Sequence, residues 1–390
     1  MSNSVRLGDI FTVSSGGTPN KKEASFYESG TIPWVKTGDL KEKYIPEGIE
    51  CITEAGLNNS SAKLFPKDTV LIAMYGATIG ACSILSYEAA TNQACAAFMP
   101  HNDVLPEYLF YFLSSKKEQF VKDGVGGAQP NISAGYLKNV KFDLKPLAKQ
   151  KEVISSLNLL DDLISLRKQQ LAKLDELVKA RFVEMFGDPE INPNNWEIIK
   201  IGKVIESCEA GWSGNGTQRQ KISGEIAVLK VSAVTKGFFV PEECKVLDNQ
   251  SDIKKYVFPQ KGDLLFSRAN TREMVGATAV ISQDYPELIL PDKLWKIRFA
   301  SCANVLYMKH ILSHQSIRAK FSEASTGTSG SMFNVSMGKF KGIEIPLPPT
   351  EIQEQFAAFV EQVDKSKLAV QQSLVKLELL KKALMQKYFG

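Results

Sequence analysis

The chain is built from two copies of one unit. The closing stretch LVKLELLKKALMQKYFG (residues 374–390) repeats LAKLDELVKARFVEMFG (171–187), and a shift of 203 positions aligns residues 131–187 with 334–390 without a gap. Of these 57 pairs, 17 are identical, where roughly 3 or 4 would match by chance. Upstream, LFPKDTVLIAMYGATIGA pairs more weakly with VFPQKGDLLFSRANTREMVGA. Each unit therefore has a diverged front part and a better preserved back part.

Composition limits the kind of protein this can be. With 390 residues, 44% of them hydrophobic, the chain can bury more than one core, and the repeat supplies the division into domains. The net charge of +4 is mild, which suits nucleic-acid contacts shared with other subunits. The six cysteines form no Cys-x-x-Cys and argue against a disulfide framework. Without a signal peptide or an apolar run near 18 residues, we expect a cytoplasmic protein with no membrane segment.

The back part of each unit predicts one long amphipathic helix. No Gly or Pro occurs from about Lys149 to Phe186, or in the copy from Glu351 to about Tyr388. Apolar residues recur at spacings of three and four, and a capping box of Thr350 and Gln353 is expected to start the second helix. The stripe is narrow, so we expect the two helices to pack together as an antiparallel coiled coil. The predicted packing residues are Leu157, Leu160, Ile164, Leu171, Leu174, Val360, Val363, Leu374 and Leu377. Alternatively, each helix packs only on its own front part.

An antiparallel pair of such helices would act as a spacer. At about 1.5 Å per residue, 35 or more helical residues span roughly 50 Å. The pair would hold the two front parts at opposite ends and give one chain an approximate two-fold axis, as a reader of two separated DNA half-sites requires. Half-sites about one to one and a half helical turns apart would fit this length, at roughly 34 Å per turn.

The front parts predict α+β domains with twisted sheets. Short β-like runs such as TVLIAMYG and DLLFSR alternate with Gly, Pro and Asn, and each front part has one predicted helix, near residues 107–122 and 305–323. The expected fold is thus two α/β domains separated by two long helices, as a pseudo-two-fold internal repeat. The expected boundaries are 1–147 and 191–349 for the front domains and 148–190 and 350–390 for the helices.

Loops rich in Gly, polar and basic residues in both front domains suit DNA. Arg and Lys can bind phosphate or guanine, Asn and Gln can pair with adenine edges, and Gly lets the backbone approach phosphate. Any one such residue is more often a solvated loop residue, so only the clusters carry weight. The candidates are Lys21, Lys22, Lys36, Tyr75, Thr78, Gln129, Asn131, Trp212, Gln218, Arg219, Lys230, Arg268, Asn270, Arg272 and Asn334.

No catalytic signature is found. The sequence MGKF does not complete a phosphate-binding Gly-Lys-Ser/Thr motif, and NPNNW is not the tetrapeptide with which adenine methyltransferases hold a flipped base. His310 and His314 could in principle bind a metal with Cys302, but the first unit has no matching histidine, so no metal site is expected. Asp161 and Asp162 are expected to be solvated, and Asp39, Asp68 and Asp263 are isolated acids beside strands.

Several motifs together resemble one family. SGGTPN, IPWVKTGDL, AMYGATIG, QPNIS, IPLPPTEIQEQ and MFGDPEINPNNW make the whole chain similar to the specificity subunit of type I restriction–modification enzymes. The resemblance implies two target recognition domains, each reading half of a split sequence in double-stranded DNA. The paired helices would set the spacer and dock two modification subunits.

The same resemblance implies a division of labour. Partner subunits would carry S-adenosylmethionine and methylate adenine at N6, and restriction subunits with ATP and Mg would add ATP-dependent cleavage. This chain would be non-catalytic and carry no cofactor. One departure is KPLAKQKE at residues 145–152, where the second unit has LPPTEIQEQ. Two other readings are open: a free-standing two-headed DNA-binding regulator and a coiled-coil scaffold that binds only protein.

Overall fold

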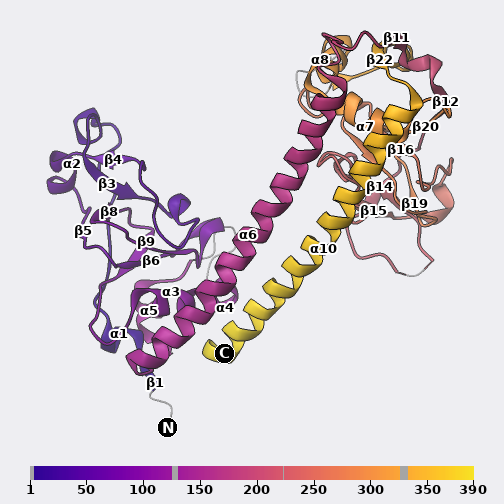
Figure 1. Cartoon of the computed structure of the whole chain (residues 1–390). Coiled ribbons are helices and arrows are strands. Elements are labelled where there is room, and N and C mark those ends of the chain that lie inside the picture. Colours follow the sequence, from indigo (N-terminus) through magenta and orange to yellow (C-terminus); the bar gives the residue numbers. More distant parts are fainter. Residues whose placement is uncertain (1–3, 125–130, 223, 326–332) are drawn as a thin grey trace. The chain divides into compact units, whose positions relative to one another are not determined.

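The computed structural model describes residues 4–124, 131–222, 224–325 and 333–390, and divides into two compact units. Unit 1 comprises residues 1–168 and 372–390, and unit 2 comprises residues 169–371. Two 40-residue helices, α6 (Leu147–Phe186) and α10 (Thr350–Phe389), contribute to both units (Figure 1). At 1.5 Å per residue, each is about 60 Å long. The prediction of two long helices is confirmed, with both ends within two residues of those expected.

Unit 1 contains two four-stranded sheets. The central sheet is antiparallel, in the order β2-β9-β6-β7, and the second sheet has the order β4-β3-β8-β5 with β3 and β8 parallel. The central strands are β2 (Val13–Ser15), β9 (Cys95–Phe98), β6 (Val70–Ala73) and β7 (Cys82–Ile84). The second sheet consists of β4 (Cys51–Ile52), β3 (Ile32–Val35), β8 (Ala89–Thr91) and β5 (Leu64–Phe65). Strands β1 (Ser4–Arg6) and β10 (Lys141–Asp143) form a separate antiparallel pair.

Short helices complete unit 1. They are α1 (Leu7–Ile10), α2 (Glu54–Asn58), α3 (Pro106–Ser115), α4 (Lys117–Asp123) and α5 (Ala134–Asn139). The predicted single helix near residues 107–122 is therefore two consecutive helices, α3 and α4. Helix α3 buries Tyr108, Tyr111 and Phe112 in the core of the central sheet.

Unit 2 repeats the central sheet and three strands of the second sheet, but its fourth strand, β13, pairs with β15, whereas β5 of unit 1 pairs with β8. Its central sheet has the order β12-β20-β16-β18, and a second sheet, β13-β15-β14-β19, again has one parallel pair. The central strands are β12 (Ile205–Ala210), β20 (Leu294–Phe299), β16 (Leu264–Ser267) and β18 (Thr278–Val280). The second sheet consists of β13 (Gly216–Thr217), β15 (Cys244–Leu247), β14 (Ala227–Leu229) and β19 (Leu288–Ile289). The pair β11 (Glu197–Lys200) and β22 (Glu344–Leu347) matches the β1 and β10 pair of unit 1.

The remaining elements of unit 2 are short. They are α7 (Val305–Ser313), α8 (Gln315–Ala324), α9 (Met337–Gly342), β17 (Ala269–Asn270) and β21 (Phe333–Asn334). Helices α7 and α8 replace the one helix predicted near residues 305–323. The α+β class and the internal repeat are confirmed by the two units.

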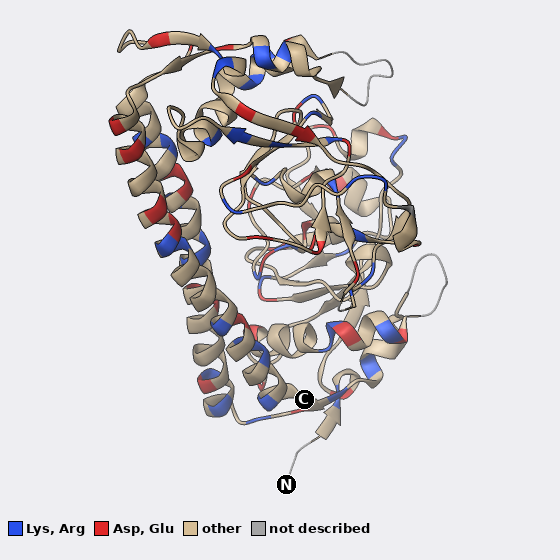
Figure 2. Cartoon of the chain, turned by 90° about the vertical axis from the view of Figure 1, so that its right-hand side faces the viewer, with Lys and Arg blue, Asp and Glu red and all other residues tan. Residues whose placement is uncertain are grey.

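Contacts within each unit make the long helices antiparallel. In unit 1, Lys381 pairs with Asp161, and Glu378 lies 3.8 Å from Lys168. In unit 2, Lys367 lies 2.6 Å from Asp175, and the rings of Phe356 and Phe186 are 5.4 Å apart. Residue numbers fall along α10 as they rise along α6, so the helices run in opposite directions. Both helices carry acidic and basic residues along their length (Figure 2).

The helices also belong to the domain cores, so the two packing alternatives are not exclusive. Leu157 of α6 and Phe389 of α10 are both buried in the core of unit 1, and Phe186 and Val360 are both buried in the core of unit 2. Leu160 and Val363 are buried, and Ile164, Leu171, Leu174, Leu374 and Leu377 are half-buried. Each front domain therefore packs on the start of one long helix and the end of the other.

A buried glutamine takes the place of the predicted capping box. The Gln353 side chain accepts a hydrogen bond from the backbone amide of Asn304 (2.8 Å) and donates to the backbone carbonyls of Cys302 (3.0 Å) and Pro348 (2.8 Å). It does not turn back to Thr350, because its amide satisfies backbone groups of the front domain. Gln150, its repeat equivalent, bonds in the same way to Leu105, Asp103 and Lys145. These glutamines join each helix start to its front domain.

Candidate nucleic-acid interface

In each unit a polar loop that follows a central strand contacts the segment before the next short helix, at equivalent positions of the repeat. The loop after β6 bridges to Asn131 through Tyr75, and the loop after β16 pairs through Ala269 with Asn334. Asn131 and Asn334 are repeat equivalents, each two residues before a serine that caps the next short helix, Ser133 (3.0 Å) or Ser336 (3.3 Å). We call each site the exit corner, formed by residues 74–80 and 131–133 in unit 1 and by residues 268–276 and 333–336 in unit 2. Thus the predicted candidates Tyr75, Thr78, Asn131, Arg268, Asn270, Arg272 and Asn334 gather at two equivalent places.

The exit corner of unit 2 is cationic. Arg272 donates from Nε to Ser322 on α8 (3.2 Å), and its guanidinium lies 5.8 Å from the ring of Phe333. Arg318 of α8 donates to the carbonyl of Glu273, and Lys339 of α9 donates to the carbonyl of Ala324 (2.8 Å). These partners are uncharged, so the positive charges are not neutralised by them. Such a corner attracts phosphate.

The exit corner of unit 1 consists mainly of uncharged polar groups, with Lys117 of α4 beside it. Tyr75 is 38% exposed. The Thr78 hydroxyl donates a hydrogen bond to the backbone carbonyl of Tyr75 (3.3 Å). Asn131 is exposed, and Lys117 of α4 lies under Gly80. Gln129 lies outside the described residues. A phenol, an amide and a hydroxyl offer a different hydrogen-bonding surface from the arginines of unit 2.

The glycine-rich loops have an internal role. A Cβ on Gly16 would lie 1.9 Å from the carbonyl oxygen of Thr91, and one on Gly211 would lie 1.9 Å from that of Leu290. Glycine is required at these two positions for packing, since the backbone there passes another segment with no room for a side chain, and the approach of these loops to phosphate stays a prediction. Lys21 and Lys22 of the first of these loops are exposed.

Several predicted cations already have partners. Lys36 pairs with Glu50, Lys230 lies 2.7 Å from Glu243 and donates to Gln218 (3.2 Å), and Arg268 donates to the carbonyl of Asp292 (2.9 Å). Arg219 binds Glu225 through both terminal nitrogens (2.9 and 2.6 Å), and its hydrogen bonds lower the pKa of Glu225 to about 2. Exposed pairs of this kind are weak, but DNA would have to displace the glutamate before Arg219 could bind phosphate.

Trp212 is not a free surface ring. It is half-buried against Val228, Leu247 and Ile289, in a small cluster between the second sheet and the loop after β12. Its backbone amide donates to the carbonyl of Leu290 (2.9 Å). It is part of the fold of unit 2, and base stacking would require it to leave this cluster.

A buried ionic network in unit 2 was not predicted. The carboxylate of Asp263 is fully buried. It accepts hydrogen bonds from Arg298 Nε (2.7 Å) and from the backbone amide of Gln260 (2.7 Å), and Lys296 Nζ lies 3.3 Å away. The sequence predicts an isolated acid at Asp263, because Lys296 and Arg298 lie more than 30 positions further along the chain. No local sequence signal joins them.

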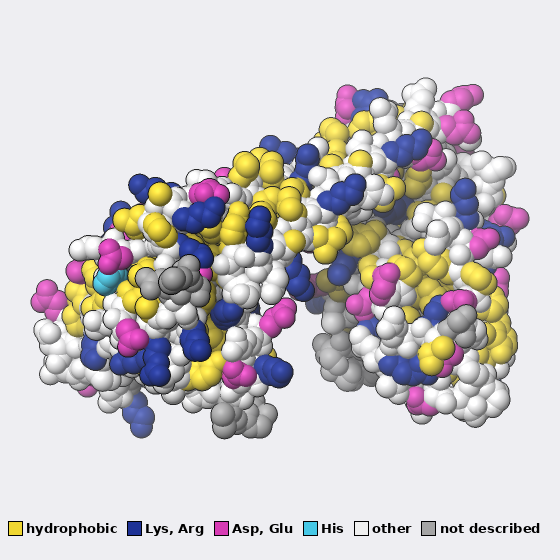
Figure 3. Space-filling model, turned by 90° about the horizontal axis from the view of Figure 1, so that it is seen from below, with side chains coloured by type: hydrophobic (Ala, Val, Ile, Leu, Met, Phe, Trp, Pro, Cys, Tyr) yellow, Lys and Arg dark blue, Asp and Glu magenta, His cyan; other side chains and the backbone are white. Residues whose placement is uncertain are grey.

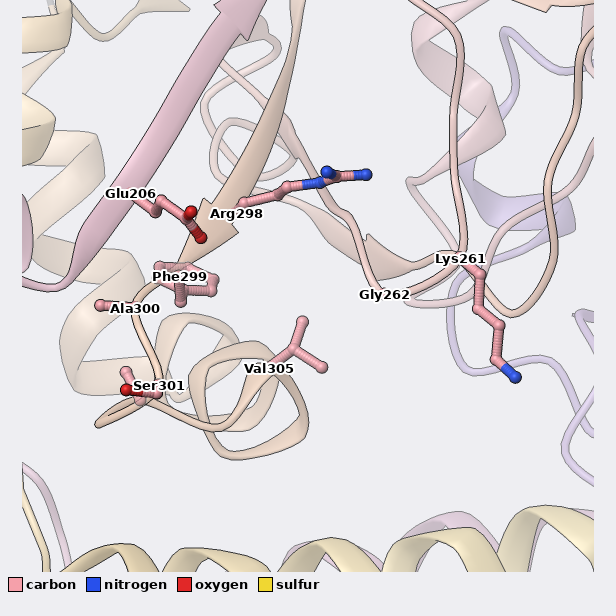
Figure 4. A pocket seen from close by; sticks show the side chains of 9 residues that line it. Glu206, Lys261, Gly262, Arg298, Phe299, Ala300, Ser301 and Val305 are labelled. Carbon is pink, nitrogen blue, oxygen red and sulfur yellow. The ribbon is translucent and has the colours of Figure 1, made fainter.

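The network borders an open hollow of about 400 Å³ (Figure 4). Glu206 and Arg298 reach it from neighbouring strands, and Lys261 lies on its far side. Its lining offers one carboxylate, one hydroxyl and no histidine or cysteine. The lining residues therefore include no Ser–His or Cys–His pair of the kind that activates a nucleophile.

The histidines do not form a metal centre. His310 packs between Phe182 and Phe356 (centroids 6.3 and 5.2 Å away), and His314 Nδ1 is 2.9 Å from the Ser316 hydroxyl. Within the described ranges no three His, Cys, Asp or Glu side chains lie close enough to hold a metal ion. The helices of the described chain include none with the length and apolar character needed to cross a bilayer.

The long helices expose apolar side chains. Leu177 and Leu380, which are repeat equivalents, are 47% and 49% exposed. Further exposed apolar residues of these helices are Leu147, Leu159, Leu166, Val183, Leu368, Val375 and Leu379. On the face drawn in Figure 3, exposed hydrophobic side chains lie among basic ones. Since packing within each unit leaves these residues uncovered, they form candidate protein-binding surfaces.

Comparison with known proteins gives a consistent picture. The sequence model of the type I restriction modification DNA specificity domain matches twice, at residues 2–176 and 193–379. The MjaIX specificity subunit of a type I restriction enzyme from Methanocaldococcus jannaschii is 24% identical over 98% of this chain and 91% of its own. The EcoKI specificity subunit from Escherichia coli K12 is 21% identical over 98% of this chain and 87% of its own.

Solved structures share the fold. A chain from a study of complex assembly and conformational transition in a type I restriction–modification system superposes with a TM-score of 0.60 at 18% identity, covering 99% of this chain and 97% of its own. The S subunit of such a system from M. genitalium gives 0.55 at 12% identity, covering 100% and 96%.

Proposed function

The chain belongs to the type I restriction modification DNA specificity family, and on that premise we propose that it is the sequence-reading subunit of a type I restriction–modification complex. Residues 1–147 and 191–349 are two target recognition domains, each reading one half of a two-part sequence in double-stranded DNA. Residues 148–190 and 350–390 set the spacing of the halves. The observation that carries this proposal is the repeated domain joined by two antiparallel helices.

The difference between the exit corners supports two different half-sites. In unit 2 the corner offers Arg272 and the cations of α8 and α9, which suit phosphate and guanine. In unit 1 it offers Tyr75, Thr78 and Asn131, with Lys117 of α4 beside them. Equal corners would favour a palindromic target. The proposed target is therefore asymmetric, like the two front sequences.

The exposed apolar residues of the long helices support partner binding. Leu177 and Leu380 occupy the same repeat position, so they offer two like surfaces to two copies of one partner. We assign these surfaces to two modification subunits, which would carry S-adenosylmethionine and methylate adenine at N6. Restriction subunits, with ATP and Mg, would add cleavage, and the complex would act on chromosomal DNA in the cytoplasm. This chain itself would supply recognition without catalysis.

The proposal is tested by mapping N6-methyladenine in the host genome with and without this gene. We expect one two-part motif with a fixed number of unread bases to lose its methylation on deletion and regain it when the gene is restored. If no motif changes, purification from the host decides between the alternatives. A protein that binds one DNA sequence without a methyltransferase would be a free-standing regulator, and one that binds a methyltransferase without retaining DNA would be a scaffold.

A further inference from the structure

Four elements of unit 1 meet at one carboxylate. Asp161 of α6 accepts a hydrogen bond from the Tyr111 hydroxyl of α3 (2.7 Å) and pairs with Lys381 of α10. Lys43 lies 3.8 Å from the same carboxylate and donates to the neighbouring Asn158 (2.6 Å). The side chains of Asp161, Lys43 and Lys381 are only 27%, 21% and 32% exposed, so solvent screens these charges less than it would on an open helix face. The expectation that Asp161 is solvated is therefore wrong.

Lys43 connects the edge strand of the central sheet, β7, to Asp161 and Asn158 of α6. Its carbonyl accepts from the Ile84 amide (2.7 Å), and the Ile45 amide donates back to the Ile84 carbonyl (3.0 Å), which fixes the Lys43 backbone to the end of β7. Its ammonium then reaches α6 and lies 4.9 Å from the ring of Tyr111. The apolar contacts of the same domain with the helices lie next to this network. They are made by Val153, Ile154 and Leu157 of α6 and by the end of α10, and the ring of Tyr111 is buried in the same core. The polar network thus adds a contact at the edge of the central sheet, beside the apolar core.

Unit 2 lacks the equivalent arrangement. Asp364, the repeat equivalent of Asp161, lies 3.5 Å from Lys367 of its own helix, and Lys367 in turn lies 2.6 Å from Asp175 of α6, with no hydroxyl or lysine of the front domain bonded to Asp364 among the described residues. In the aligned stretches KYIPE and FFVPE, Phe238 takes the place of Lys43 and is 56% exposed. His310 takes the place of Tyr111, and its buried Nε2 has no hydrogen-bond partner within the described residues. Because unit 2 folds without this network, the fold alone does not require it in unit 1.

We propose that Lys43, Tyr111, Asp161 and Lys381 form a clasp that fixes the first recognition domain on the helix pair and thereby determines which spacer length the protein accepts. The inference rests on the function proposed above. Without the clasp, the sheet edge could rock about the apolar contacts. For a domain with a radius of gyration of roughly 15 Å, a rotation of about 10 to 15° moves its outer loops by roughly 3 to 4 Å. That is about the rise of one base pair.

The test uses the complex of this chain with its methyltransferase subunits, and duplexes that carry the mapped half-sites with the native spacer or one base pair more or less. Methyl transfer to each duplex is measured for the wild type and for Asp161→Asn, Lys43→Met and Lys43→Arg. We expect Asp161→Asn and Lys43→Met to weaken the preference for the native spacer roughly tenfold, as loss of a coupled network would. Lys43→Arg, which keeps the cation, should retain the preference, and so should the matched control Asp364→Asn in unit 2.

The outcomes separate the two claims. If the wild-type complex methylates no two-part site, the proposed function fails. If the wild type prefers one spacer and both clasp variants prefer it equally strongly, the clasp fails while the function stands. Should Asp161→Asn not fold, Tyr111→Phe removes a single hydroxyl and decides in the same way. A purely structural role would lower the melting temperature without changing the ratio of rates between spacers, and that result would overturn the inference.

Discussion

The ring of Phe389, in the last turn of the second long helix, lies 5.2 Å from the ring of Tyr108 in the core of unit 1. Its repeat equivalent, Phe186, lies 4.9 Å from Tyr307 in the core of unit 2. Lys116 also donates to the carbonyl of Phe389 (2.7 Å), so the chain end is held by a ring and by a hydrogen bond. Each front domain is therefore completed by the helix of the other repeat.

Replacing Phe389 by Ala should destabilise unit 1 by about 3 kcal/mol, because it removes a buried ring and leaves a cavity. Hydrogen exchange followed by mass spectrometry should show faster exchange in α3 (Pro106–Ser115), while α7 of unit 2 is unchanged. Phe186→Ala should give the opposite pattern. Equal effects of either variant on α3 and α7 would contradict this assignment.

The buried glutamines give a second prediction. Gln353→Ala should cost about 2 to 3 kcal/mol, because it leaves the Asn304 amide and two carbonyls without their partner. Gln150→Ala should cost a similar amount in unit 1. The matched control is Gln371→Ala, since Gln371 is exposed on the same helix as Gln353 and should change stability by less than about 0.5 kcal/mol. Urea unfolding measures all three, and a Gln353→Ala variant as stable as the control would refute the role.

The helices could be predicted from the sequence because their evidence is local. Gly and Pro are absent over the whole of α6 and α10, and apolar residues recur at helical spacing. The roles of polar residues on those helices could not be predicted, because periodicity does not say which flank meets a front domain. Asp161 and Gln353 were both misjudged in this way, since their partners come from segments far away in the chain.

The candidate interface was found in part. The sequence repeat aligns Asn131 with Asn334. Their pairing with the loops after β6 and β16 could not be predicted, because it depends on how the central sheet folds. Arg318 and Lys339 were missed because a helix charge is usually just solvated, and only packing brings them beside Arg272. The loop that contains Arg219 predicts a contact with DNA, but the same loop region supplies Glu225 as the partner of Arg219.

His310 predicts how stability depends on pH. Burial lowers its pKa to about 3, whereas an unfolded histidine titrates near 6.5. Between these values the unfolded state binds the proton and the folded state does not, so unit 2 should lose stability as pH falls from about 6.5 towards 3, by about 1.4 kcal/mol per pH unit. His310→Phe should remove this slope, since the ring keeps its packing on Phe356 without a titratable nitrogen. Thermal melting at several pH values checks the prediction, and an unchanged slope would exclude His310 as its source.

The exit corner of unit 2 predicts which arginines matter for DNA. Arg272→Ala should weaken binding to the mapped target about tenfold, because its charge is unneutralised and lies beside the cations of α8 and α9. Arg219→Ala should change affinity by less than about twofold, because Glu225 already occupies that guanidinium. Binding of the complex to labelled duplex at two salt concentrations measures both. A larger loss for Arg219 than for Arg272 would move the interface away from the exit corner.

The buried network of unit 2 predicts that three changes will be tolerated better than one. Strand pairing matches Asp263, Lys296 and Arg298 with Thr69, Ala97 and Met99 of unit 1, where no charge is buried. Asp263→Thr alone should destabilise unit 2 by about 3 to 5 kcal/mol, because the amine of Lys296 loses its counter-charge.

The triple variant Asp263→Thr, Lys296→Ala, Arg298→Met should recover most of that loss, since it removes the unpaired charges and installs residues that the same fold accepts in unit 1. Urea unfolding of both variants at neutral pH provides the comparison. If the triple variant is less stable than Asp263→Thr, the ionic network contributes net stability to unit 2, and the residues of unit 1 do not replace it.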